Sequence, residues 1–310
     1  MRKGYGKVNS VICEVEADST DLLEALTMTG IGNVKVCKDI TSLANMLEEG
    51  LVDLVFCNFD TAGQEFLDFI KKVRRRKARG RNPFVIVIAT VSNANVATVK
   101  TMIDAGVDDL IRKPFTIDRV VDGVTKLARS RKPFVACFDY VGPTRRAPQR
   151  DSLDSASLIQ VPNTLHGKVM RNESDAQLQR ALDLALIDIE DKQLEAVSRE
   201  IVHMVERIGE ASENPERHGE LGGLRDRLHL LSEDFCQRSE KSASPQLTNL
   251  TKLFSSILSR TREKSADEVN NLRLLSKLAA AIYRAVTVER DALDLMREMV
   301  EAVAFSASPP

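Results

Sequence analysis

Two nearly unbroken apolar runs constrain the first part of this chain most strongly. Residues 51–57 contain a single charged side chain, Asp53, and residues 84–89 contain none. A strand that is apolar along its whole length must be covered on both of its faces. Parallel sheets with helices on both sides provide that cover, so the two runs predict an α/β fold.

Shorter β-like runs and amphipathic segments alternate around these two strands. The other β-like runs are residues 11–13, 34–37 and 109–112, and the amphipathic segments are residues 18–29, 40–49, 64–78, 95–105 and 116–130. Five strands alternating with five helices predict a doubly wound, parallel five-stranded sheet of the flavodoxin-like type. Ligands of such sheets gather outside the carboxyl ends of the strands, so functional side chains are expected there.

The character of the sequence changes twice after residue 130. Residues 131–170 contain four prolines and no sustained period, which indicates a linker. Apolar residues at helical spacing then recur in four segments with short breaks, as in Leu224, Leu228 and Leu231, and predict an antiparallel four-helix bundle. We therefore expect an α/β domain at 1–130, a Pro-rich linker at 131–170 and a separate all-α bundle at 171–306.

Composition narrows the function classes. The 310 residues are 43% hydrophobic, and their formal net charge of −1 gives no overall attraction to nucleic acid or anionic membranes. No run of 18 apolar residues occurs, and the first residues lack the apolar stretch of a secretory signal. Five cysteines are scattered singly, which is typical of reduced intracellular thiols. We expect a cytoplasmic protein without a membrane span.

Polar side chains follow the predicted strands where a parallel sheet would bring them together. They are Glu14 after the first strand, Asn58 and Asp60 after the third, Thr90 after the fourth and Lys113 after the fifth. Carboxylates hold hard cations, whereas lysine and hydroxyl groups bind phosphate oxygens. An acidic group, a hydroxyl and a lysine at one mouth are therefore the parts of a Mg²⁺ and phosphoryl site.

Residues 105–115 carry the most specific pattern, Ala-Gly-Val-Asp-Asp-Leu-Ile-Arg-Lys-Pro-Phe. This segment resembles the Ala-Gly-Ala-x-x-Tyr-x-x-Lys-Pro-Phe segment of bacterial response regulator receiver domains, the fold of the chemotaxis receiver protein. The strand endings at 55–60 and 85–90 agree with it, so the resemblance covers residues 8–130. It implies two-component (phosphorelay) signal transduction, a phosphoacceptor pocket at the strand ends and a cis peptide before Pro114.

The departures from the family pattern change the functional expectation. Asn58 stands where the family has its phosphoacceptor aspartate, and an amide is a poor nucleophile, so no acyl phosphate is expected. The acidic pair of the family aligns with Glu14 and Val15, which leaves one carboxylate. We therefore expect no cofactor, with at most weak Mg²⁺ binding at Glu14 and Asp60. Leu110 also replaces the aromatic switch residue. The pattern predicts a phosphorylation-independent pseudo-receiver without enzymatic activity.

Three alternatives stay open at this point. Asp60 or Glu14 is a substitute acceptor in the first, which keeps the protein an active phosphorelay member. The α/β fold is only a scaffold in the second. In the third, His203 on the longest helix acts as a phosphotransfer histidine, but the residues that follow it lack the patterns of phosphotransfer domains and kinase dimerisation helices. A surface or interface role for His203 is favoured.

A basic cluster lies at residues 71–81. Its members are Lys71, Lys72, Arg74, Arg75, Arg76, Lys77, Arg79 and Arg81. Such a cluster is typical of a surface that binds a polyanion, and a nucleic-acid-binding regulator is the alternative function. The cluster contains no aromatic residue and the chain is nearly neutral, so an acidic protein partner is favoured over nucleic acid.

The expected function is therefore signalling by protein–protein interaction. The helical module at 171–306 is expected to bind a signalling partner and to form a homodimer. Residues 139–146, Asp-Tyr-Val-Gly-Pro-Thr-Arg-Arg, resemble a Tyr-x-Gly-Pro-Asp-Arg-Arg segment of other receiver-containing proteins, with Thr144 in place of Asp. We interpret them as a docking segment.

Overall fold

The computed structural model describes residues 4–14, 19–78, 80–145, 158–241, 244–261 and 268–306. By its internal contacts the chain divides into two units, Met1–Ile189 and Glu190–Pro310. One helix, α7 (Asp175–Glu213), contributes residues to both units. Each unit is described separately below.

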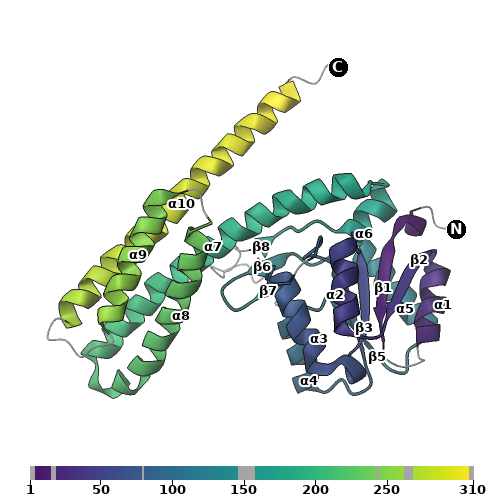
Figure 1. The fold of residues 1–310 in the computed structure, drawn as a ribbon, viewed down its shortest axis with the longest axis horizontal. Helices are drawn as coiled ribbons and strands as arrows, with labels where there is room; N and C mark the ends of the chain where they lie inside the picture. The colour runs from purple at the N-terminus through teal and green to yellow at the C-terminus, as the bar shows by residue number, and fades with distance from the viewer. Residues whose placement is uncertain are drawn as a thin grey trace. The chain divides into compact units, whose positions relative to one another are not determined.

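The first unit contains the predicted parallel sheet (Figure 1). Its strands are β1 (Asn9–Cys13), β2 (Asn33–Cys37), β3 (Leu54–Asn58), β4 (Ile86–Val91) and β5 (Asp109–Arg112), and a short turn of helix, η1 (Tyr5–Lys7), precedes β1. The strand order is β2-β1-β3-β4-β5, and every pairing is parallel. All residues of β3 and β4 are buried, as their apolar sequences predict. The expected doubly wound α/β fold is confirmed.

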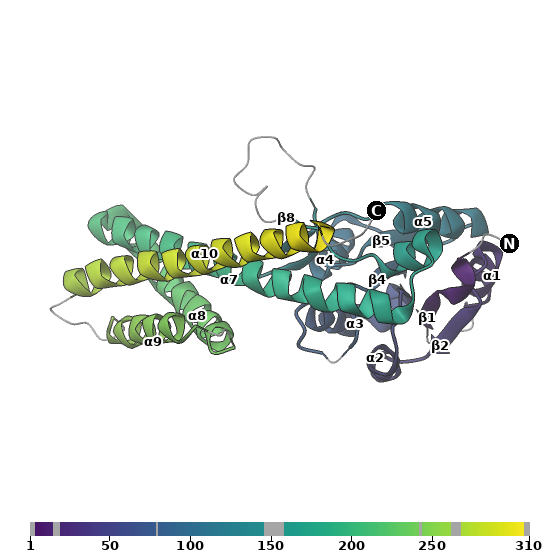
Figure 2. The same ribbon diagram turned by 90° about the horizontal axis from the view of Figure 1, so that it is seen from above.

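Helices cover both faces of this sheet (Figure 2). They are α1 (Ser19–Thr29), α2 (Ile40–Glu49), α3 (Phe59–Arg74), α4 (Val96–Ala105) and α5 (Ile117–Arg129). Alternate strand residues point to opposite faces, so Val55 packs with α2, α3 and α4, whereas Phe56 packs with α1 and α5. Sequence periodicity placed α3 about five residues too late, because Asn58 ends β3 and caps α3 directly by accepting the N–H of Asp60.

Residues 131–170 contain more structure than the linker that the sequence indicated. Three short antiparallel strands, β6 (Phe134–Ala136), β7 (Val141–Pro143) and β8 (Leu158–Ile159), form a second sheet of order β7-β6-β8. Two helical turns follow, α6 (Thr164–His166) and η3 (Gly167–Arg171). Strands of two or three residues are too short to display a period, which is why the sequence pattern did not reveal them.

The second sheet shares a hydrophobic core with the beginning of α7. Phe134 and Ala136 of β6 pack there with Ile159 of β8 and Phe84. The helix supplies Leu178, Leu182, Ala185 and Ile189 to the same core. The first unit therefore ends at Ile189, beyond the expected boundary at 170, because the first half of α7 completes its core.

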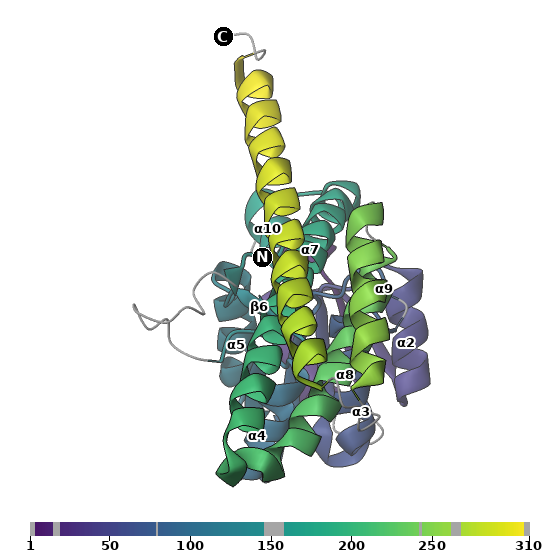
Figure 3. The same cartoon turned by 90° about the vertical axis from the view of Figure 1, so that its left-hand side faces the viewer.

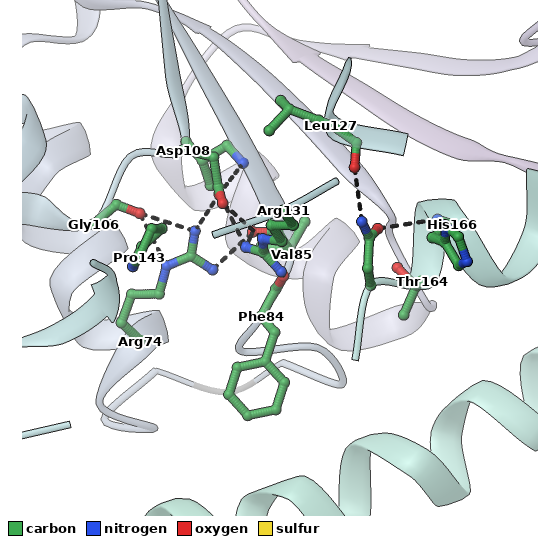
Figure 4. Close-up of polar contacts among 12 residues, drawn as sticks. Arg74, Phe84, Val85, Gly106, Asp108, Leu127, Arg131, Pro143, Thr164 and His166 are labelled. Atoms are coloured by element: carbon green, nitrogen blue, oxygen red, sulfur yellow. Dashed lines mark hydrogen bonds and ion pairs between the residues drawn. The ribbon is translucent and has the colours of Figure 1, made fainter. Parts of the chain in front are cut away.

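Asp108, in the turn before β5, lies between two arginines from different elements (Figure 4). Arg74 Nη2 and Arg131 Nε donate to its carboxylate at 2.9 and 2.7 Å, and the N–H of Val87 donates at 2.9 Å. Both guanidinium groups also lie over the Phe134 ring, 5.3 and 4.7 Å from its centroid. This buried cluster connects α3, β4 and the end of α5 to β6.

The second unit is helical, as predicted (Figure 3). It contains the rest of α7, a turn η4 (Pro215–Glu220), α8 (Leu221–Ser239), α9 (Pro245–Arg260) and α10 (Glu268–Ser306). Apolar side chains on the predicted stripes form its interior, including Leu228, Phe235, Phe254 and Ile257. The periodic apolar positions therefore predicted correctly that this unit is helical. Within the described ranges, no helix combines the length and the apolar composition of a transmembrane span.

Lys168 in η3 makes a buried ion pair in the first unit. Its Nζ lies 2.8 Å from Asp53 Oδ2, just before β3, and 2.8 Å from Asp175 Oδ1 at the start of α7. The backbone N–H of Asn9 also donates to Asp53 Oδ2, at 2.8 Å. Burial raises the pKa of the Asp53 carboxyl above its ordinary value, and the Lys168 ammonium opposes that rise.

Replacing this lysine should destabilise the first unit in a pH-dependent way. Lys168→Met leaves Asp53 buried without its cation, which costs about 3–5 kcal/mol of unfolding free energy near neutral pH. A carboxyl with a raised pKa in the folded state takes up a proton before the unfolded chain does, so stability recovers as the pH falls. Urea unfolding at pH 7.5 and pH 5 should show a smaller deficit at pH 5; an equal deficit at both pH values contradicts this account.

Candidate functional site

The carboxyl ends of the parallel strands form a pocket that gathers four of the predicted side chains. Glu14 follows β1, Asn58 is the last residue of β3, and Thr90 of β4 pairs in register with Asn58. Lys113 follows β5, and its backbone N–H donates to Val91 at 2.8 Å. The Lys113–Pro114 peptide is cis, as the resemblance implied.

One oxygen of Glu14 is the centre of this pocket. Asn58 Nδ2 donates to Glu14 Oε1 at 2.7 Å, and Lys113 Nζ lies 3.4 Å from the same oxygen. The Glu14 side chain is 1% exposed and that of Lys113 is 17% exposed, so water screens their attraction weakly. The Glu14 oxygen at the strand ends is therefore shared by two neighbouring side chains.

The orientation of the Asn58 amide follows from a second hydrogen bond. Asn58 Oδ1 accepts the backbone N–H of Asp60 at 3.1 Å and caps α3. With the oxygen at the helix terminus, the NH₂ group faces Glu14. An aspartate carboxylate at this position has no hydrogen to donate, so the hydrogen bond to Glu14 Oε1 comes from the amide.

Asp60 does not take part in the Glu14 contacts. Its carboxylate accepts the backbone N–H of Ser92 at 2.9 Å and the Ser92 hydroxyl at 2.7 Å, and its second oxygen lies 3.1 Å from the same N–H. These bonds connect the start of α3 to the loop after β4. The sequence analysis missed this role of Ser92, and only the packing of the two loops reveals it.

Thr90 lies in the pocket wall rather than on its surface. The residue is fully buried, and within the described part of the chain its hydroxyl has no hydrogen-bond partner. Leu110, at the position of the usual aromatic switch residue, is half-buried and packs against the core on the α2–α3 side. Neither side chain therefore presents a polar group to the surface.

Other predicted residues lie outside the pocket or outside the described chain. Val15 belongs to residues 15–18, which are not among the described ones. His203 is exposed on α7. In the described ranges, no group of three or more His, Cys, Asp or Glu side chains is placed to hold a metal ion.

The structure corrects one member of the basic cluster. Arg74 is 2% exposed and belongs to the core of the first unit, where its guanidinium donates to Gly106, Pro83 and Val85. Burial lowers its pKa to about 10, with the Asp108 carboxylate opposing that shift, so the group remains charged at neutral pH. Arg74 follows Ile70 by four residues and therefore lies on the buried face of α3.

The other described members of the cluster remain at the surface. Lys72, Arg76, Lys77 and Arg81 are exposed, and Lys71 and Arg75 are half-buried. Lys71 Nζ lies 3.6 Å from Asp68, and Arg75 donates to the carbonyl of Asp139. Arg79 is outside the described residues.

Comparison with known proteins assigns the fold to a family. The family model described as "Response regulator receiver domain" matches residues 12–125. The strand order and the cis peptide after Lys113 agree with that match. Residues 12–125 are a response regulator receiver domain, which implies two-component signalling, and a separate helical unit follows it.

Solved structures similar to this chain include response regulators and a receiver domain. A response regulator from Thermotoga maritima is 26% identical and covers 40% of this chain and 99% of its own, with a TM-score of 0.35. The receiver domain of the TMAO respiratory system response regulator TorR is 20% identical. The match covers 39% of this chain and 95% of that chain, with a TM-score of 0.34. The response regulator DrrB, an OmpR/PhoB homologue from Thermotoga maritima, is 17% identical. The match covers 59% of this chain and 87% of that chain, with a TM-score of 0.33. No curated protein matches the chain.

The Glu14 carboxylate should contribute more to stability than the more exposed Asp60 carboxylate. Glu14→Gln removes the charge that both Asn58 and Lys113 contact, so we expect a loss of about 1.5–3 kcal/mol of unfolding free energy. Asp60→Asn, the matched control, should cost about 1 kcal/mol or less, since water competes for its hydrogen bonds. Urea midpoints measure both values, and equal losses would contradict the central role of Glu14.

Proposed function

We propose that this receiver domain works without phosphorylation and that the protein signals by binding other proteins through its helical unit. The observation that carries the first part is the shared Glu14 oxygen. Asn58 occupies the acceptor position with an amide, which lacks a nucleophilic oxygen, and that amide is already bonded to Glu14 at 2.7 Å. The Lys113 ammonium, which would bind a phosphoryl oxygen in an ordinary receiver, faces the same carboxylate.

The pocket also lacks the donor set that Mg²⁺ requires. Mg²⁺ prefers near-octahedral oxygen ligands with one or two free carboxylates. Glu14 is buried and shares its oxygen with Asn58 and Lys113, and both oxygens of Asp60 accept hydrogen bonds from Ser92. A cation would have to displace these partners, so these side chains do not fit a resident Mg²⁺.

Treatment with a small phosphodonor tests the first part of the proposal. The full chain, incubated with acetyl phosphate and Mg²⁺, should show no mass gain of about 80 Da, the addition expected for a phosphoryl group. A receiver with an intact acceptor aspartate, treated in parallel, shows that the donor is active. Asn58→Asp is the matched variant, in which a carboxylate returns to the acceptor position.

A phosphoryl group on the unaltered protein would contradict the proposal. Peptide mapping then identifies which substitute acceptor operates, with Asp60, Glu14 and His203 as the candidates. Labelling at Asp60 or Glu14 would restore the ordinary receiver mechanism at a new residue. Labelling at His203 would place the chemistry in the helical unit.

Exposed apolar side chains support the second part of the proposal. In the helical unit, Leu230 of α8, Leu253 of α9 and Val269 of α10 are more than half exposed. A contiguous exposed apolar patch is typical of a surface that packs against another protein, and these three residues are the positions at which that contact is tested. A second copy of the chain and a signalling partner are the two occupants proposed for this unit.

Light scattering on the full chain tests self-association. We expect a dimer, and Leu253→Glu should weaken it at least about tenfold, because a charge replaces an apolar contact that is 51% exposed in the single chain. Met28→Glu, at a 65% exposed position of α1 in the receiver unit, is the control and should leave the dimer unchanged. A monomer at high concentration would contradict homodimerisation.

A further inference from the structure

Residues 140–145 contact the C-terminal end of α4. They include β7, which forms an antiparallel hairpin with β6. Gly106 ends α4 with φ +90°, and Gly142 of β7 lies directly against it. A Cβ atom at position 142 would lie 3.0 Å from the Gly106 Cα and 2.6 Å from the Tyr140 hydroxyl. A methyl group at position 142 would have to displace the Tyr140 ring and would crowd the Gly106 backbone, which explains the glycine of the Gly-Pro pair.

The side chains of Arg145 and Tyr140 make further contacts at this junction between the hairpin and α4. Arg145 Nη1 lies 2.5 Å from Asp104 Oδ1 on the last turn of α4, and its guanidinium lies 3.7 Å from the centroid of the Tyr140 ring. The Tyr140 hydroxyl donates to the carbonyl of Pro143 at 2.7 Å, so the ring itself is held in place. Arg145 therefore has a partner on α4, and Tyr140 has its partners within residues 140–145.

The same hairpin continues into the core that holds α7. Phe134 and Ala136 of β6 pair with Pro143 and Val141 of β7. Phe134, Ala136 and Val141 are buried in the core to which Leu178 and Leu182 of α7 belong. The hairpin therefore contacts α4 at Gly106 and α7 through these side chains.

We propose that residues 140–145 are an internal clamp that couples the position of α4 to the first half of α7. Helices of a doubly wound sheet run antiparallel to its strands, so α4 begins beside the strand-end pocket and ends at the clamp. A partner that displaces α4 would move Gly106, the hairpin and the α7 side chains packed on it. The helix α7 continues past Ile189 into the helical unit. Coupling from α4 through the hairpin to α7 depends on packed side chains, so it needs no phosphoryl group.

The clamp is not the only attachment of this region. Lys168 pairs with Asp53, and Asn163 Nδ2 donates to the carbonyl of Leu127 at 2.7 Å. If these contacts alone positioned α7, breaking the clamp would loosen the hairpin and leave the helix unchanged. The two cases predict different patterns of amide hydrogen exchange.

Hydrogen exchange on the full chain with Gly142→Ala distinguishes them. The new methyl group has to displace the Tyr140 ring and also crowds Gly106, so exchange should rise about fivefold in residues 134–143 and also in residues 175–189, with β1 and β3 unchanged. Gly222→Ala is the matched control, because a Cβ at that position of α8 meets nothing within 4 Å. A rise confined to residues 134–143, or no rise, overturns the proposal.

A charge-reversal pair gives an independent readout if Gly142→Ala disturbs the whole unit. Arg145 and Asp104 are both about one-third exposed, so Arg145→Glu and Asp104→Arg leave the core intact. Each single variant should raise exchange in residues 175–189 about twofold, and the double variant, which restores the ion pair, should exchange more slowly than either single variant. A double variant that exchanges as fast as the single ones overturns the proposal.

Discussion

The buried carboxylate of Asp108 is the interaction on which the first unit depends. Two guanidinium groups, from Arg74 and Arg131, bind it at 2.9 and 2.7 Å in a core that excludes water. Desolvating three charges is costly, and the cost is offset only because backbone carbonyls satisfy the remaining donors and the Phe134 ring lies under both cations. This cluster joins the receiver sheet to the second sheet, and through it to α7.

At the carboxyl ends of the strands, one amide changes the chemistry of the pocket. In an ordinary receiver the pocket binds a cation and a phosphoryl group, so its carboxylates must stay free. Here Asn58 and Lys113 share the Glu14 oxygen, and Ser92 occupies both oxygens of Asp60. The lost negative charge also removes repulsion between neighbouring acids. Together these contacts support a receiver whose strand-end side chains hold one arrangement, with signals passing through packed elements instead of a phosphoryl switch.

The sequence predicted the parallel sheet and the helical unit because both depend on local periodicity and on burial of whole strands. It also predicted which side chains meet at the strand ends, since parallel strands align their carboxyl termini. It did not predict the partners of those side chains, such as Ser92 with Asp60, because these depend on how two loops pack. Arg74 was placed at the surface because a cation is rarely buried, and its partner Asp108 is distant in sequence. The strands at 134–159 were missed because each spans two or three residues.

The central claim is that the hydrogen bond between the Asn58 amide and Glu14 persists when Mg²⁺ and a phosphoryl mimic are present. Nuclear magnetic resonance of the Asn58 side-chain NH₂ group reports on this bond directly, while Mg²⁺ and beryllofluoride, a phosphoryl mimic, are added to the full chain. The account predicts that both amide proton resonances stay in place and remain slow to exchange with water. Their displacement at saturating mimic, together with changes at Lys113, would show that the pocket opens for a phosphoryl group and would contradict the account.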